Sequence, residues 1–421
     1  MVIVGGGFGG LACARALAGA PVEVLLLDRN DHHEFTPLLY QVATALLTAS
    51  DIAYPFRAAF RSAPNIRFQR ALAEGVDLVG RTVLTSGGRR VDYDYLVLAC
   101  GSEDEHFGSA ALEANTLGIK TLAAAQRLRE HILACLEEAA GAEDDLERRR
   151  WLSFVVIGGG PTGVEFTGAL VELLALVLGR DYRELEPGLA RVTLVEGGER
   201  LLPSFPARLG RYAARVLMRR GVEVLTGTLV ETADAEGVYL ADGRQLPART
   251  TVWSAGVRAR SLRGLPDQAR RRAARMAVDE CLRLAGAERV FAIGDLAAAR
   301  PDGEELPMLS APAMQEGRYV ARAILADLAG RRTARFRYRD KGTMAVVGRG
   351  SAVASIHGLQ LTGWIGWVAW LAVHIYYLVG FRNRAAVLVS WGWNYLRRDR
   401  PIRMITAKDS DPLVERLLGH G

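Results

Sequence analysis

Three glycines at a fixed spacing follow a short apolar stretch at the start of the chain. The stretch 2–4 (Val-Ile-Val) runs into Gly5-x-Gly7-x-x-Gly10, and a helical pattern follows. Such glycines allow a sharp turn, a close backbone approach to a diphosphate and tight packing of a helix on the preceding strand. The next apolar stretch ends in Asp28, where a carboxylate can accept hydrogen bonds from both hydroxyls of an adenine-linked ribose. The alternative is an ordinary glycine turn.

The same pattern returns 153 residues later as Gly158-x-Gly160-x-x-Gly163, again behind an apolar stretch. Two later segments keep nearly this offset, because Tyr95-Leu-Val-Leu-Ala-Cys-Gly101 matches Thr250-Thr-Val-Trp-Ser-Ala-Gly256. A repeat of this length predicts two related α/β halves, each with its own dinucleotide.

In the second half, an acid again ends the second apolar stretch. Glu196 favours NADH over NADPH, because its carboxylate would repel a 2′-phosphate. Arg200 lies near enough in the sequence to leave NADPH open. Glu165, two residues after the last glycine, fits a place near a nicotinamide, but a first-turn acid also stabilises a helix through the macrodipole. Both explanations stand.

A third site follows a late apolar stretch, 289–293, which ends in Gly294-Asp295. A carboxylate at the end of such a strand could accept a hydrogen bond from a ribityl hydroxyl of a flavin. On its own this is a strand followed by an acid. Beside two dinucleotide loops it indicates FAD.

The motifs, taken in order, resemble those of the type II NADH dehydrogenases, flavoproteins with two dinucleotide-binding domains. The resemblance runs nearly from end to end, and its motifs are Gly-Gly-Gly-Phe-Gly-Gly-Leu, Phe-x-Pro-Leu-Leu-Tyr-Gln-Val-Ala-Thr, Gly-Gly-Gly-Pro-Thr-Gly-Val-Glu, Ser-Ala-Gly-Val, Phe-Ala-Ile-Gly-Asp and Asp-Lys-Gly-Thr-Met-Ala-Val-Val-Gly.

The resemblance implies a set of site residues. FAD would be held by Gly5, Gly7, Gly10, Asp28, Gly101 and Asp295, and NADH by Gly158, Gly160, Gly163, Glu196 and Gly256. Three residues would serve catalysis: Glu165 near the nicotinamide, Lys341 near the pyrimidine end of the flavin, and Gln315 beside the quinone pocket. A solvated loop lysine is the alternative for Lys341.

One segment departs from the family pattern Ala-Gln-x-x-x-Gln. The sequence Ser310-Ala-Pro-Ala-Met-Gln315 keeps the last glutamine and has Ala311 where the first would be. A polar contact to a quinone or to the flavin is therefore missing, which leaves the identity of the acceptor less secure than the fold.

We therefore expect an α/β protein with two Rossmann-like dinucleotide-binding domains, the second inserted in the first, and a C-terminal amphipathic membrane-anchoring region. The predicted bounds are 1–118 and 261–335 for the FAD domain, 119–260 for the NADH domain, and 336–421 for the C-terminal region. Within these, 66–84 is predicted to form small antiparallel strands and 120–140 a long amphipathic helix.

The C-terminal region predicts contact with a membrane surface. No fixed charge occurs from Leu359 to Phe381, and aromatic residues recur there at three- and four-residue steps. About 23 residues would be long enough to span a bilayer. Spread tryptophans, interrupting glycines and nearby arginines instead favour helices that lie in the interface. Packing against a second copy in a homodimer is the alternative.

Charge and termini bear on partners and location. The net charge is +6, and six arginines gather near the C-terminus: Arg382, Arg384, Arg397, Arg398, Arg400 and Arg403. Their apolar neighbours favour an anionic membrane over nucleic acid. The first strand starts at the N-terminus, so we expect no secretory signal and a peripheral location on the cytoplasmic face of the inner membrane.

Cysteines and histidines do not predict a metal or a dithiol. The four cysteines, Cys13, Cys100, Cys135 and Cys281, show neither C-x-x-C nor zinc-ligand spacing. The adjacent His32 and His33 are predicted to be polar loop residues.

The expected function is FAD-dependent oxidation of NADH in a respiratory chain. Hydride would pass from NADH to FAD, and a membrane quinone would then take two electrons and two protons, without proton pumping. Two alternatives stay open: a reductase of a soluble acceptor such as a small redox protein, and a membrane-associated flavin-based NADH sensor.

Overall fold

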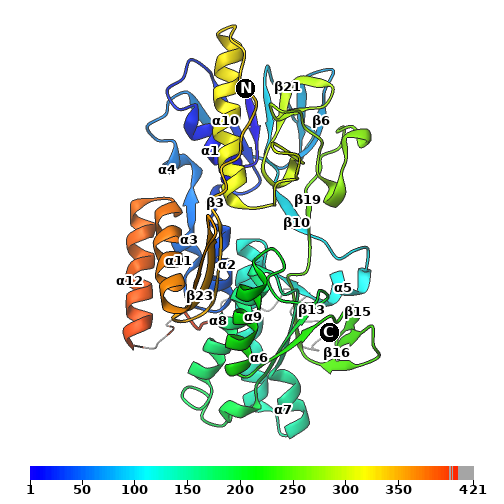
Figure 1. Cartoon of the computed structure of the whole chain (residues 1–421), viewed down its shortest axis with the longest axis vertical. Coiled ribbons are helices and arrows are strands. Elements are labelled where there is room, and N and C mark those ends of the chain that lie inside the picture. The colour runs from blue at the N-terminus through cyan, green and yellow to red at the C-terminus, as the bar shows by residue number, and fades with distance from the viewer. Residues whose placement is uncertain (398–399, 401, 406–421) are drawn as a thin grey trace. The chain divides into compact units, whose positions relative to one another are not determined.

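The computed structural model describes residues 1–397, 400 and 402–405 of the 421-residue chain. The backbone forms two compact units, each assembled from segments far apart in the sequence (Figure 1). The first unit contains Met1–Glu34, Ala53–Glu103 and Val257–Lys341, and the second contains Phe35–Ile52, Asp104–Gly256 and the chain from Gly342 onward.

A six-stranded sheet forms the centre of the first unit. Its strand order is β20 (Arg283–Leu284), β21 (Ala287–Ala292), β9 (Leu96–Leu98), β1 (Val2–Val4), β2 (Val24–Asp28) and β5 (Ile66–Arg70). All neighbours are parallel except β20 and β21. Strands β1 and β9 are fully buried, which is why they read as continuous apolar runs in the sequence.

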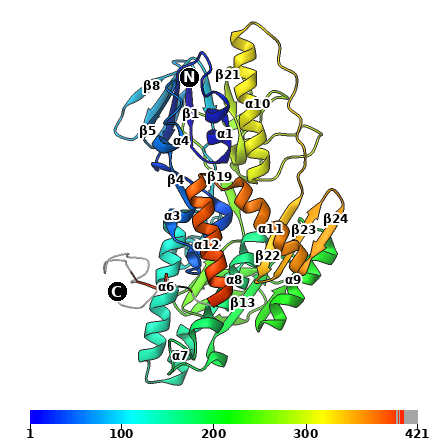
Figure 2. The same ribbon diagram turned by 90° about the vertical axis from the view of Figure 1, so that its left-hand side faces the viewer.

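Two helices cross closely beside this sheet. Helix α1 (Phe8–Ala16) and helix α10 (Ser310–Leu328) lie side by side in both ribbon views (Figures 1 and 2). A Cβ atom at Gly317 of α10 would lie 2.2 Å from the Gly9 carbonyl oxygen of α1. Glycine at position 317 therefore sets the distance between the two helices.

Smaller elements complete the first unit. They are the antiparallel ribbon β3 (His32–Glu34) with β4 (Ala53–Pro55), the meander β6 (Ala73–Asp77), β7 (Thr82–Thr85) and β8 (Arg90–Asp92), the pair β10 (Ser102–Asp104) and β19 (Val257–Ala259), and helix α4 (Phe56–Ala59). The prediction of antiparallel strands over 66–84 is therefore correct for β6 and β7 and wrong for β5, which pairs in parallel with β2.

The second unit has its own parallel sheet. The strand order is β11 (Leu117–Gly118), β18 (Thr250–Trp253), β12 (Ser153–Ile157), β13 (Arg191–Glu196) and β14 (Val222–Thr226). The repeat predicted from the sequence extends to pairing, because β1 lies between β2 and β9 as β12 lies between β13 and β18.

Helices and two small sheets surround that sheet. The helices are α2 (Leu39–Ala43), α3 (Ala49–Ile52), α5 (Ala110–Asn115), α6 (Leu122–Gly141), α7 (Asp145–Trp151), α8 (Pro161–Val177) and α9 (Ala207–Arg219). The sheets are β15 (Val230–Asp234), β16 (Gly237–Leu240) and β17 (Gln245–Pro247), and β22 (Thr343–Gly348), β23 (Ser351–Ile356) and β24 (Leu359–Thr362). Helix α6 confirms the long helix predicted over 120–140.

Two further helices, α11 (Gly363–Tyr377) and α12 (Phe381–Arg397), pack against each other in the second unit (Figure 2). The first four residues of the uncharged stretch from Leu359 form strand β24, so the helix begins at Gly363. Among the described residues, no helix combines the length and the apolar character needed to cross a membrane.

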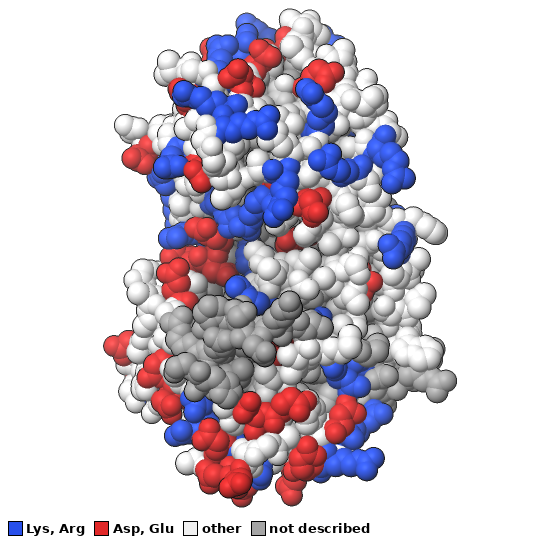
Figure 3. All heavy atoms as spheres, turned by 180° about the vertical axis from the view of Figure 1, so that it is seen from behind, with Lys and Arg blue, Asp and Glu red and all other residues white. Residues whose placement is uncertain are grey.

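The charge on the surface is mixed in sign. Figure 3 shows basic and acidic side chains together over the face that it presents. The net charge of +6 is therefore not gathered there into one basic patch.

We predict that Gly317→Ala lowers the free energy of unfolding by roughly 1–3 kcal/mol, because the added methyl group must force the α1 and α10 backbones apart. Chemical denaturation monitored by circular dichroism measures the change. The control is Gly392→Ala in α12, where a Cβ meets open space and alanine should be neutral or stabilising. Equal stability of the two variants would contradict the close crossing.

Candidate functional site: two glycine loops and the acids beside them

The first glycine loop joins β1 to α1 under tight steric limits. Gly5 has φ +100°, and a Cβ there would lie 2.2 Å from the Ala99 carbonyl oxygen. A Cβ at Gly10 would lie 1.8 Å from the Gly5 carbonyl oxygen. At Gly7 a Cβ would meet no atom within 4 Å, and no side chain caps the helix that begins at Phe8. The loop thus leaves room in front of Gly7 at the start of a helix without a side-chain cap, which fits a diphosphate.

Asp28 fixes the middle of this loop. Its Oδ2 accepts from the Gly6 N–H at 2.6 Å and its Oδ1 from the Asn30 N–H at 2.8 Å. Burial raises the pKa of Asp28, and these two backbone hydrogen bonds oppose the rise. On the other side of Gly6, the Phe56 ring would lie 2.1 Å from a Cβ. Gly6 is therefore held between an acid and an aromatic ring.

The two adjacent histidines lie in strand β3 rather than in a loop. His33 is buried and its Nδ1 lies 3.0 Å from the Gly6 carbonyl oxygen. Burial lowers the pKa of His33 to about 4, so its ring is neutral. The loop interpretation of His33 was wrong, and the ring supports the glycine loop.

Asp295 lies in the same unit, in a short 3-10 turn after β21. The Ser102 hydroxyl donates to Asp295 Oδ2, and Ser102 directly follows Gly101, which has φ +70°. The preceding Gly294 has φ +67°. The carboxyl end of β21 thus presents an oriented carboxylate beside the end of β9, its neighbour in the sheet.

The second loop repeats the first in detail. Gly158 has φ +108°, a Cβ at Gly163 would lie 1.9 Å from the Gly158 carbonyl oxygen, and a Cβ at Gly160 would meet nothing within 4 Å. Helix α8 begins at Pro161 without a side-chain cap. Its geometry therefore also fits a diphosphate.

Glu196 makes the same hydrogen bonds in the second loop as Asp28 makes in the first. Its Oε2 accepts from the Gly159 N–H at 2.6 Å and its Oε1 from the Gly198 N–H at 2.7 Å. Arg200 donates to the carbonyl oxygens of Phe205 and Pro203, each at 2.7 Å. Because its guanidinium is engaged by these carbonyls, Arg200 is poorly placed to receive a 2′-phosphate.

The end of β18 supports the second loop. The Ser254 hydroxyl donates to the carbonyl oxygens of Ile157 at 2.8 Å and Gly158 at 3.0 Å. A Cβ at Gly256 would lie 2.8 Å from the Phe107 ring. The Ser254 hydroxyl therefore binds the second glycine loop to the end of β18.

Glu165 is buried in α8, with 9% of its surface exposed. Burial raises the pKa of its carboxyl group to about 8, while a hydrogen bond from the Val346 N–H at 3.2 Å opposes the rise. The buried Trp370 Nε1 makes no hydrogen bond to a described residue. A pKa of about 8 keeps the Glu165 carboxyl group largely protonated at neutral pH.

Gln315 and Lys341 lie in the first unit. The Gln315 side chain makes a reciprocal pair of hydrogen bonds to the Arg339 backbone, donating to the carbonyl oxygen and accepting from the N–H, each at 3.0 Å. Lys341 is exposed two residues later, at the end of an irregular segment. Gln315 therefore anchors the segment that leads to Lys341, and Ala311 lies one turn earlier in α10, half-buried.

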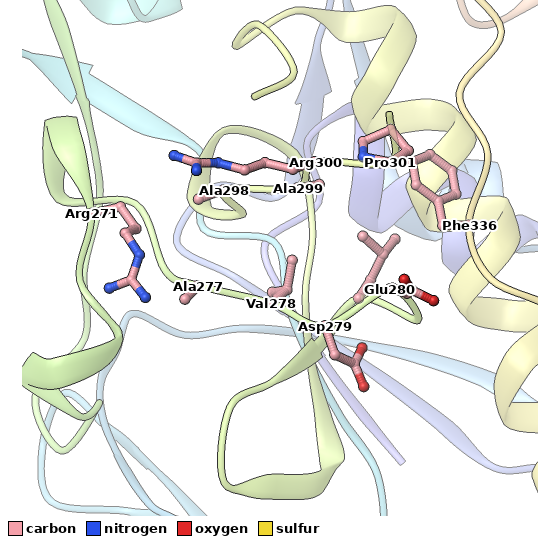
Figure 4. Close-up of a pocket in the computed structure, with 11 residues that line it drawn as sticks. Arg271, Ala277, Val278, Asp279, Glu280, Ala298, Ala299, Arg300, Pro301 and Phe336 are labelled. Atoms are coloured by element: carbon pink, nitrogen blue, oxygen red, sulfur yellow. The ribbon is translucent and has the colours of Figure 1, made fainter. Parts of the chain in front are cut away.

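A separate cavity of about 390 Å³ lies in the first unit (Figure 4). It is lined by Arg271, Ala277, Val278, Asp279, Glu280, Leu282, Ala298, Ala299, Arg300, Pro301 and Phe336. The site residues predicted from the sequence are not among them.

Comparisons with known proteins bear on this arrangement. Residues 1–317 match the family of pyridine nucleotide-disulphide oxidoreductases. The chain is 38% identical to the type II NADH:quinone oxidoreductase Ndh of Mycobacterium tuberculosis, over 96% of this chain and 90% of that protein. The chain belongs to the type II NADH:quinone oxidoreductase family. A second relative, the type II NADH:quinone oxidoreductase of Staphylococcus aureus, is 30% identical over 86% of this chain and 91% of its own length.

Solved structures agree on the fold of this type II family member. NDH2 of Plasmodium falciparum, solved in complex with NADH, has a TM-score of 0.87 at 19% identity and covers 95% of this chain and 99% of its own. The predicted family and the predicted fold of two dinucleotide-binding domains are confirmed. All four cysteines are free, and Cys13 and Cys135 are buried.

The structure of this type II chain adds neighbours of the predicted site residues that the sequence analysis missed. Ser102 binds Asp295, Arg339 binds Gln315, and Phe56 packs on Gly6 in the first loop. A signal existed for Ser102, because a hydroxyl directly after Gly101 lies at the carboxyl end of a strand. Phe56 had none, since its role depends on how β4 and α4 fold back on the glycine loop.

The buried carboxyl group of Glu165 makes stability depend on pH. Its folded pKa is raised, so the stabilisation is complete below about pH 4.5 and is lost as pH rises through about 8. The free energy of unfolding of the wild type should therefore fall with rising pH by about a few kcal/mol at most. We expect Glu165→Gln to lose most of this pH dependence. Urea unfolding between pH 5 and pH 9 measures it. Glu143→Gln, on an exposed residue, is the control and should follow the wild type.

Proposed function

We propose that this chain oxidises NADH with bound FAD and transfers two electrons to a membrane quinone without pumping protons. One observation carries the proposal: the chain folds two glycine loops that leave open space at Gly7 and Gly160. Beside each loop an acid accepts a hydrogen bond from the N–H of the preceding glycine, Gly6 or Gly159. Membership of the type II NADH:quinone oxidoreductases supports the quinone as acceptor.

Each unit is assigned one cofactor, FAD to the first unit and NADH to the second. We assign FAD to Gly5, Gly7, Gly10, Asp28, Gly101 and Asp295, and NADH to Gly158, Gly160, Gly163, Glu196 and Gly256. When bound, FAD supplies the two-electron chemistry that amino-acid side chains lack. The protein binds and orients the two cofactors. Glu196 accepts hydrogen bonds from the ribose hydroxyls of NADH and repels the 2′-phosphate of NADPH.

Proton balance gives Glu165 a proposed role. Reduction of a quinone consumes two electrons and two protons, and hydride from NADH carries both electrons and one proton. A carboxyl group with a pKa of about 8 can hold and release the remaining proton near neutral pH. Lys341 is assigned to stabilise negative charge near the flavin, and Gln315 anchors its segment through Arg339.

Helix α12 supports membrane attachment because large apolar side chains lie on its exposed face while polar side chains lie among its buried residues. Its buried face carries amides and an indole: Asn383 donates to the Ser50 carbonyl oxygen at 3.2 Å, and Trp391 Nε1 donates to Gln41 Oε1 at 2.8 Å. Val387 is buried with them, but other large apolar side chains are exposed. They are Phe381, Leu388, Val389 and Trp393 on α12, with Trp364, Ile365, Val368 and Tyr376 on α11.

The expected roles of the aromatic residues and arginines need correction. Trp364 is 66% exposed and Trp370 only 1%. The two side chains are six residues apart in α11, so they point about 120° apart around the helix axis. Arg384 donates to the Leu378 and Tyr376 carbonyl oxygens. Arg400 is buried against the Thr44 carbonyl oxygen, and Arg403 pairs with Asp181.

Of the six arginines, Arg382 is exposed and fits a phospholipid headgroup. Arg398 lies outside the described residues, as does the side chain of Arg397. We therefore propose a peripheral attachment that depends mainly on apolar contact with the cytoplasmic face of the membrane.

Anaerobic stopped-flow on the FAD-loaded protein tests the function. We predict that NADH bleaches the flavin absorption band, that NADPH does so about tenfold less efficiently or worse, and that a short-chain quinone restores the band. Glu196→Gln should narrow the NADH preference, because like-charge repulsion of the 2′-phosphate is removed. Bleaching without recovery would contradict quinone as the acceptor and favour a soluble one, and a single slow reduction would favour a sensor.

Flotation with phospholipid vesicles tests the attachment. We predict that Val389→Glu lowers vesicle binding about tenfold or more, because a carboxylate must enter the interface. Val79→Glu is the matched control, since Val79 is 97% exposed in a turn of the first unit. Loss of self-association in Val389→Glu, with vesicle binding unchanged, would instead identify the face as a homodimer interface.

A further inference from the structure

Helix α10 carries a carboxylate on its buried face. Glu316 is 1% exposed, and its neighbours on that face are small or apolar, including Ala313, Gly317 and Val320. A carboxylate in such a place requires a partner, because burying an unpaired charge is costly. The roles assigned above make no use of it.

The partner is the backbone of the turn that carries Asp295. Glu316 Oε2 accepts a hydrogen bond from the Gly294 N–H. Gly294 has φ +67°, and a Cβ there would lie 3.3 Å from the Ala313 Cβ. The turn is thus held from two sides, since Glu316 binds its backbone and the Ser102 hydroxyl binds the Asp295 carboxylate.

The surroundings of Glu316 include a few titratable groups. Burial raises the pKa of Glu316 to about 7 and Asp295 adds to the rise, while the Gly294 N–H and Arg275 oppose it. Arg275 is itself anchored by the Leu306 and Ala297 carbonyl oxygens. Tyr338 and, on α1, Cys13 stay neutral, because burial raises the pKa of each to about 12.

We propose that Glu316 is a positioning residue for FAD, whose carboxylate fixes the Gly294–Asp295 turn so that Asp295 meets the ribityl chain. The inference rests on the proposed function, in which Asp295 binds FAD. Its consequence is a link between FAD affinity and the charge of Glu316. An ionised carboxylate is the stronger acceptor for the Gly294 N–H, so FAD affinity should fall as the solution is acidified from pH 8 to pH 6.

FAD titration of the deflavinated full-length protein, followed by quenching of flavin fluorescence, tests the inference without turnover. We expect Glu316→Ala to weaken FAD binding at least tenfold. Glu316→Gln, which keeps an acceptor oxygen, should recover most of this affinity and lose the pH dependence. The control is Asp327→Asn, which removes a carboxylate from the far end of α10, where it accepts from the Tyr95 hydroxyl. It should bind FAD as the wild type does at every pH.

Two results would overturn the inference alone: FAD affinity of Glu316→Ala within twofold of the wild type, or a pH dependence of Glu316→Gln that matches the wild type. If Glu316→Ala does not fold, the pH profile of Glu316→Gln decides. Absence of FAD binding by the wild-type protein would instead overturn the proposed function, and this inference with it.

Discussion

The contact between the third glycine of each loop and the carbonyl oxygen of the first is the constraint on which the structure depends. At Gly10 and at Gly163 a Cβ would come within 2 Å of that oxygen. Each helix therefore starts directly behind the strand end, and neither helix start has a side-chain cap. In the first unit the crossing of α1 and α10 at Gly9 and Gly317 transmits this placement to α10, which carries Gln315 and Glu316.

The two halves of the chain orient their glycine loops in the same way, with Asp28 in the first and Glu196 in the second. Each acid accepts from the N–H of the glycine that directly follows the first loop glycine: Asp28 from Gly6, and Glu196 from Gly159. Each also accepts from the N–H two residues after itself. These two hydrogen bonds fix the backbone of each glycine loop and place a carboxylate beside it. The supports then diverge: His33 and Phe56 pack around the first loop, whereas the Ser254 hydroxyl binds carbonyl oxygens of the second.

The sequence predicted those site residues whose neighbours in the structure are also close in the chain. Gly5, Gly158 and the acids that follow could be found because turn, strand end and helix start are close in the chain. Residues 35–52 belong to the second unit and not with their sequence neighbours, because Gln41 and Leu46 are bonded by Trp391 and Asn394 of α12. Contacts over some 350 residues leave no periodic signal. For the same reason neither Glu316 nor the parallel pairing of β5 could be read from spacing.

Helix α12 shows why the spacing of the C-terminal aromatic residues did not predict which of them are buried. In a water-soluble helix the amides would face solvent, but Asn383 and Asn394 turn inward because they hydrogen-bond carbonyl oxygens of the 46–50 segment. Trp391 turns inward for the same reason, through Gln41. This orientation leaves Phe381, Leu388 and Val389 exposed on the surface of the unit. The polar contacts inside the unit and the apolar side chains on its surface are therefore two consequences of one helix orientation.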